Sequence, residues 1–118
     1  MTGLYGTEKQ IMFATDIMAV TIDALEKHKK LHKELESCIN TSIKYLSYIN
    51  DSGFIINNLK EVCYTRKHNE RMAIIIEYMA YSECTAYYEL IDKIDDDVIK
   101  TLEKFDVSYD TLKRVRYL

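Results

Sequence analysis

Apolar residues recur every three to four positions along the first third of the chain, which is the spacing of one face of an α-helix. One column of residues spaced seven apart in this segment contains Ile11, Met18, Leu25, His32, Ile39 and Leu46. The neighbouring columns are also mostly apolar, so the face is wider than the seam of a coiled coil. The pattern therefore predicts an amphipathic helix with a broad buried side.

The boundaries of this helix can be read from local signals. The segment "TEKQ" at residues 7–10 matches a capping box, and no glycine or proline follows until Gly53. A single helix over about residues 7–50 would be about 66 Å long, whereas a compact domain of this size is about 35 Å across. Either the polar middle, "EKHKKLHKELES", bends, or the helix projects and pairs with a second copy. We expect the projecting helix and a homo-oligomer, because no cause of a kink is visible.

The remainder of the chain also has helical spacing and turn signals. Helix starts are expected near Phe54, Asn69, Asp95 and Ser108, and no alternating strand pattern is present. The predicted fold is all-α. Residues 1–118 would form a single helical domain, with four or so shorter helices over 54–118 completing a small bundle around part of the long helix.

Composition narrows the function classes. The chain has 118 residues, no proline and a net charge of −3, which argues against nucleic-acid binding through an overall positive field. Its first residues lack the basic lead of a signal peptide and the length of a membrane span, and its three cysteines form no CxxC pair. We expect a cytoplasmic protein without membrane contact. Its usage of Ile, Lys, Tyr and Asn suggests a phage or virus, whose protein would work in the host cytoplasm.

The C-terminal segment "EKFDVSYDTLKRVRYL" resembles the turn and recognition helix of helix-turn-helix proteins, particularly the MerR-like form. Phe105 takes the place of that family's leucine, Asp106 that of its glycine, and Val107-Ser108 precede Thr111-Leu112-Lys113-Arg114. The resemblance implies that the outward side chains contact phosphates or base edges; these are Tyr109, Lys113, Arg114 and Arg116. The alternative, favoured by the acidic surroundings, is a capped helix that closes the bundle.

Other chemistry is sparse in the sequence. His28 and His32 lie four residues apart with Glu36 one turn further on, a spacing that can hold a divalent metal. Four lysines at positions 27, 29, 30 and 33 would oppose a cation, so we expect no metal and no cofactor. The absence of phosphate-loop, GxSxG and HExxH motifs favours a protein that is not an enzyme.

The leading functional hypothesis is a small regulatory or accessory protein that binds another protein. Its contacts would come from the apolar face of the long helix and from a tyrosine-rich segment, with Ile11, Met18, Leu25, Ile39, Leu46, Tyr78, Tyr81 and Tyr88 as the candidate residues. The alternative is a helix-turn-helix DNA-binding protein, either a transcriptional regulator or a genome-packaging recognition subunit, that uses the C-terminal helix.

Overall fold

Helices account for most of the computed structural model, which describes residues 4–80, 82 and 84–114. The α-helices are α1 (Glu8–Leu31), α2 (Glu36–Ser47), α3 (Ser52–Leu59), α4 (His68–Ala80), α5 (Ala86–Lys93), α6 (Asp96–Lys104) and α7 (Tyr109–Arg114), with 3-10 helices η1 (Lys33–Leu35) and η2 (Lys60–Cys63). The described residues contain no strand, and one isolated bridge joins Tyr5 to Asp51. The predicted all-α fold is thus confirmed.

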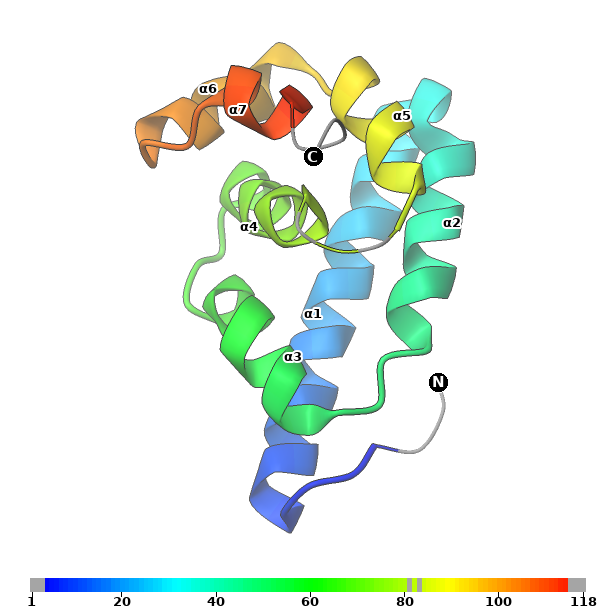
Figure 1. The fold of residues 1–118 in the computed structure, drawn as a ribbon, viewed down its shortest axis with the longest axis vertical. Helices are drawn as coiled ribbons and strands as arrows, with labels where there is room; N and C mark the ends of the chain where they lie inside the picture. Colours follow the sequence, from blue (N-terminus) through cyan, green and yellow to red (C-terminus); the bar gives the residue numbers. More distant parts are fainter. Residues whose placement is uncertain (1–3, 81, 83, 115–118) are drawn as a thin grey trace.

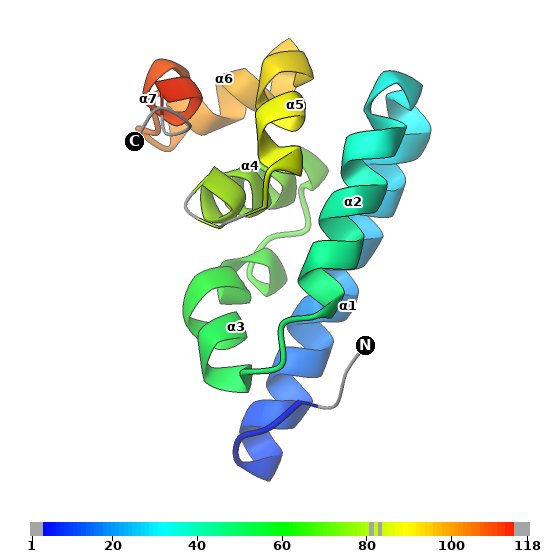
Figure 2. The same cartoon turned by 45° about the vertical axis from the view of Figure 1, so that its right-hand side comes forward.

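The expected continuous helix over residues 7–50 is wrong. α1 begins at the predicted capping box of Thr7 and Gln10, but it ends at Leu31, where His32 adopts φ −135° and ψ 84°. The chain reverses through η1, and α2 runs back beside α1 (Figures 1 and 2). The two helices form an antiparallel hairpin, and the longest extent of the structure is 39 Å.

Packing explains why the chain reverses although it has no glycine or proline there. Leu35, within the turn, is fully buried, whereas the flanking lysines stay at the surface. Reversal lets the apolar positions of residues 11–25 and those of residues 39–46 enter the same core. A straight helix would leave one of the two sets in water, and each large apolar side chain left exposed forfeits about 1.5–3 kcal/mol.

One cluster of buried apolar side chains extends from Ala14 on α1 to Leu112 on α7. α1 packs against α2, α3, η2 and α4, while α4 also contacts α5 and α6. α5 bridges α2 and α7. None of the helices in the described part of the chain has the length and apolarity required to cross a bilayer.

Most predicted helix starts lie close to the observed ones. α3 begins two residues before Phe54, because the Asp51 side chain accepts a hydrogen bond from the Phe54 N–H at 3.2 Å and Gly53 falls inside the helix. α4 begins one residue before Asn69. Asp95 occupies the N-cap position of α6, and the Ser108 hydroxyl accepts from the Thr111 N–H at 3.3 Å at the start of α7. Local sequence signals therefore placed these starts to within two residues, although Asn69 lies inside α4 and does not cap it.

Candidate functional site

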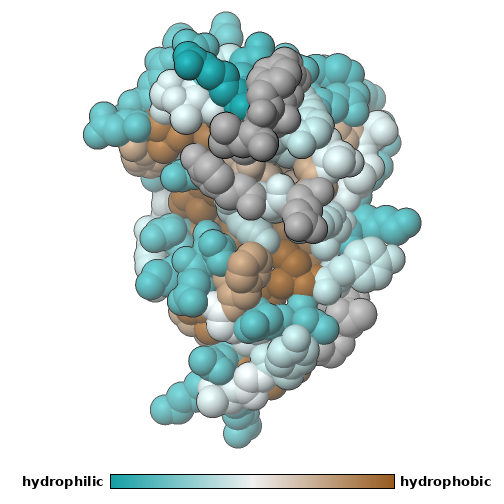
Figure 3. All heavy atoms as spheres, viewed as in Figure 1, coloured by the Kyte–Doolittle hydropathy of each residue, from teal (hydrophilic) through white to brown (hydrophobic). Residues whose placement is uncertain are grey.

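A groove of about 490 Å³ lies between α4, the end of η2 and the turn after α6. Its lining residues are Glu61, Tyr64, Thr65, Glu70, Ile74, Glu77, Phe105 and Val107. Two of the apolar residues are strongly exposed, Tyr64 at 68% and Phe105 at 44%. Figure 3 shows hydrophobic residues reaching the surface on the α3–α4 side of the molecule, among hydrophilic ones. The groove is thus lined by apolar and aromatic side chains together with glutamates.

A second hollow continues this groove along α4. It has a volume of about 230 Å³ and shares Glu61, Ile74 and Glu77 with the first, adding Asn57, Asn58 and Tyr78. At its far end the rings of Phe54 and Tyr78 meet edge to face, with centroids 5.9 Å apart. Burial raises the pKa of Tyr78, so its phenol stays neutral. We name the two hollows together the α4 groove.

The charge of the α4 groove is uniformly acidic. Glu61, Glu70 and Glu77 line it, and no lysine or arginine is among the lining residues. Carboxylates beside apolar side chains attract a cationic ligand and repel phosphate or an acidic segment.

Two local structures position the aromatic residues of this groove. The Arg71 guanidinium donates from Nε to the carbonyls of Val62 and Thr65, each at 3.0 Å, and holds the segment after η2 against α4. On the other side, Asp106 adopts a φ of +60° and the Val107 N–H donates to the Leu102 carbonyl at 2.9 Å. This left-handed turn ends α6 and brings Phe105 and Val107 to the groove.

The predicted partner-binding residues are distributed differently from the expectation. Met18, Leu25, Ile39 and Leu46 are at most 1% exposed and lie in the core of this chain, so their side chains are not on its surface. The apolar face expected to oligomerise is therefore used to close the hairpin. Ile11 is half-buried.

The three tyrosines of the same prediction are not brought together in the described residues. Tyr78 lines the α4 groove. Tyr88 is 42% exposed on α5, and its ring meets that of Tyr87 edge to face. Tyr81 lies outside the described residues. Tyr78 is thus the predicted residue that lines the groove, while Tyr64 and Phe105, which were not among the predicted partner-binding residues, reach it from segments 10 or more residues before and after the middle of α4.

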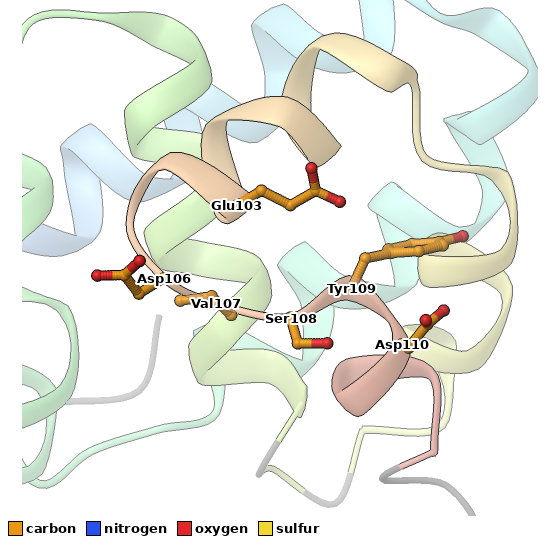
Figure 4. Close-up of a pocket in the computed structure, with 6 residues that line it drawn as sticks. All are labelled: Glu103, Asp106, Val107, Ser108, Tyr109 and Asp110. Atoms are coloured by element: carbon orange, nitrogen blue, oxygen red, sulfur yellow. The ribbon is translucent and has the colours of Figure 1, made fainter.

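The turn between α6 and α7 is acidic. Glu103, Asp106 and Asp110 contribute to a hollow of about 350 Å³ at the N-terminal end of α7 (Figure 4). Tyr109, expected to point outward, instead extends toward α5, where its hydroxyl donates to the Ile91 carbonyl at 2.8 Å. Tyr109 is thus a packing residue between α7 and α5.

One of the basic residues of α7, Lys113, lies beside a carboxylate. The Lys113 ammonium lies 5.5 Å from the centre of the Tyr109 ring and 3.9 Å from an Asp92 carboxylate oxygen. Arg114 is exposed, and Arg116 lies outside the described residues.

All three histidines of the chain meet beside Asp95, an arrangement that the sequence did not indicate. His28 Nδ1 lies 2.9 Å from His68 Nε2, and His28 Nε2 lies 2.9 Å from Asp95 Oδ1. His32 Nε2 is 3.7 Å from the same Asp95 oxygen. Glu36, the partner that sequence spacing suggested, is exposed on α2 and is not part of this group. We name His28, His32, His68 and Asp95 the histidine cluster.

Burial favours the neutral imidazole at two histidines of the cluster, His28 and His68. Burial lowers the pKa of His28, although Asp95 opposes the change. Burial together with the neighbouring His28 lowers the pKa of His68 to about 4. Neutral imidazole is the form of histidine that ligates metals.

Comparison of the chain with family models, with curated proteins and with solved structures finds no match.

Proposed function

We propose that this chain is a non-enzymatic regulatory or accessory protein that binds another protein through the α4 groove. Its ligand would be an amphipathic helix or peptide with apolar residues on one side and lysine or arginine on the other. The supporting observation is that two exposed aromatic residues, Tyr64 and Phe105, line the same groove as three glutamates. This proposal moves the binding surface from the long-helix face to α4 and its neighbours.

Size and chemistry both support a peptide ligand. A groove of several hundred Å³ is large enough for a few side chains, and exposed aromatics that become buried supply much of the energy at protein interfaces. Acidic groups at the rim speed the approach of a basic partner and select against acidic ones. No lysine or arginine is among the described residues that line the groove.

The cysteines fit a reducing compartment such as the cytoplasm, where a phage or viral protein would meet a host partner. Cys38, Cys63 and Cys84 are unpaired. Burial raises the pKa of the Cys38 and Cys63 thiols, so both stay protonated and react slowly.

The groove proposal predicts a specific loss of binding. A fluorescent amphipathic helix of leucine and lysine should bind the purified protein, and Phe105→Ala should weaken it about tenfold, since losing one buried aromatic contact costs over 1 kcal/mol. Glu77→Lys should also weaken binding and reduce its salt dependence. Fluorescence anisotropy at two salt concentrations measures both effects.

The matched control is Tyr48→Ala. Tyr48 is a 63% exposed aromatic at the end of α2 and is not a lining residue of the groove. Binding should be unchanged in this variant, and a helix of leucine and glutamate should not bind. Equal losses of peptide affinity in Tyr48→Ala and Phe105→Ala would rule out the groove as the binding site. Binding of the leucine and glutamate helix as tight as that of the leucine and lysine helix would also rule it out.

A helix-turn-helix DNA-binding protein is the second candidate. The turn at Asp106 with φ +60° and the capping contact of Ser108 favour it, because the matching family position is a glycine that tolerates positive φ. Glu103, Asp106 and Asp110 at the start of α7 oppose it.

If DNA is the ligand, duplex binding at low salt should disappear at high salt and in the triple variant Lys113→Ala, Arg114→Ala, Arg116→Ala. The groove proposal expects neither duplex binding nor an effect of this variant on the peptide.

A further inference from the structure

The histidine cluster has the donor set and the spacing of a metal site. One nitrogen each of His28 and His32 and one oxygen of Asp95 lie within 4.8 Å of one another. The two distances to Asp95 Oδ1, 2.9 Å from His28 Nε2 and 3.7 Å from His32 Nε2, lie on either side of the roughly 3.3 Å that separates ligands in a tetrahedron with metal bonds of about 2.0–2.1 Å. Side-chain shifts that bring the three donors, none more than 4.8 Å from another, to this spacing would place all three around one ion.

The outer nitrogens of both ligand histidines have partners. If His28 ligates through Nε2, its Nδ1–H faces His68 Nε2 at 2.9 Å. If His32 ligates through Nε2, its Nδ1 faces a Glu34 carboxylate oxygen at 3.5 Å. Metal-ligating histidines commonly have such an acceptor on the second nitrogen, because it selects the tautomer and fixes the ring. Three candidate ligands, His28, His32 and Asp95, are thus flanked by two outer residues, His68 of the cluster and Glu34 outside it.

The side chain of Asp95 contacts a histidine of the cluster in place of capping its own helix. It occupies the N-cap position of α6 with φ −73° and ψ 156°, yet its side chain makes no capping hydrogen bond. A capping aspartate normally accepts from the backbone N–H two or three residues later, a bond worth about 1 kcal/mol. The carboxylate of Asp95 is turned toward His28 instead.

The neighbouring lysines do not occupy the site. The Lys29 ammonium is 2.9 Å from both Glu26 Oε2 and Asn40 Oδ1 and so lies toward α2. Lys27, Lys30 and Lys33 are exposed, where water and salt screen their charge. An ion can reach the site from solvent through two of the three residues. The His28 side chain is 1% exposed, but those of His32 and Asp95 are 29% and 19% exposed.

We propose that His28, His32 and Asp95 bind a divalent transition-metal ion, Zn²⁺ first, with His68 and Glu34 as outer partners. Two imidazoles and one carboxylate suit zinc and leave a fourth position for water or a ligand from another molecule. The ion would join the C-terminal end of α1 to the start of α6, across 67 residues of sequence. Metal binding would therefore stabilise the hairpin turn against the C-terminal half of the chain.

The test is titration of chelator-stripped, full-length protein with ZnCl₂, using a chromophoric zinc indicator as competitor and thermal melting as a second readout. We expect one ion per chain and, at a hundredfold excess over the dissociation constant, a melting temperature raised by roughly 5–15 °C. Co²⁺ in place of Zn²⁺ should develop the visible absorption of a tetrahedral ion.

Variants separate this site from adventitious binding. Asp95→Asn and His32→Ala should weaken zinc binding by more than about 100-fold, and His68→Gln and Glu34→Gln by about 10–100-fold. Asp96→Asn and Glu36→Gln are the controls: Asp96 is exposed next to Asp95, and Glu36 is the ligand that sequence spacing alone suggests. Both should bind zinc as the unchanged protein does.

Two results would overturn the proposal. One is the absence of zinc binding at about 100-fold molar excess in protein that melts cooperatively. The other is binding that survives both Asp95→Asn and His32→Ala, in variants whose circular dichroism shows an intact fold. Peptide binding at the α4 groove is measured in a separate experiment. A negative result for zinc therefore does not contradict the groove proposal, and a negative result for the peptide does not contradict the metal site.

Discussion

Replacing Tyr87 by alanine is expected to lower the free energy of unfolding by about 3–5 kcal/mol, the range for truncating a large buried aromatic. Tyr87 is 1% exposed on α5, and its hydroxyl donates to the Leu112 carbonyl of α7 at 2.9 Å. The side chain therefore both fills the core and holds α7 in place. Urea unfolding followed by circular dichroism measures the loss.

Two further variants divide this loss into packing and hydrogen bonding. Tyr87→Phe keeps the ring and removes the hydroxyl, so we expect a loss of about 1 kcal/mol. The adjacent Tyr88, 42% exposed, supplies the matched control, and Tyr88→Ala should cost less than about 1 kcal/mol. Similar losses at positions 87 and 88 would contradict the described packing of α5.

Proline substitution at two positions should distinguish the helical hairpin from a continuous helix. Ala19→Pro, on the exposed side of α1, should cost about 3 kcal/mol or more, because proline removes a helical hydrogen bond and clashes with the preceding turn. Lys33→Pro should cost less than about 1 kcal/mol. Lys33 is the first residue of η1, where a backbone donor is not required, and His32 before it already has a non-helical conformation.

The measurement is again urea unfolding, in the presence of a chelator so that metal at His32 does not contribute. A loss at Lys33→Pro as large as that at Ala19→Pro would mean that residue 33 lies within a continuous helix. Small losses at both positions would mean that α1 does not extend through residue 19.

The histidine cluster illustrates what local sequence leaves undetermined. The i, i+4 spacing of His28 and His32 is visible in the sequence, but their partners His68 and Asp95 lie at the starts of other helices, α4 and α6. Glu36 has the right spacing on an unbroken helix and the wrong position in a hairpin. The reversal of the chain at His32 thus decided which carboxylate reaches the imidazoles.

Sequence alone was sufficient for the helical class and for helix starts such as Thr7 and Ser108, because capping and apolar periodicity are interactions within a few residues. Tertiary structure alone decided the reversal at His32, the burial of the expected interface and the meeting of Tyr64 with Phe105 in the α4 groove. No local breaker marks the reversal, since its energy comes from sharing one core among distant apolar positions. The groove and the histidine cluster follow from that shared core, which no short window of sequence contains.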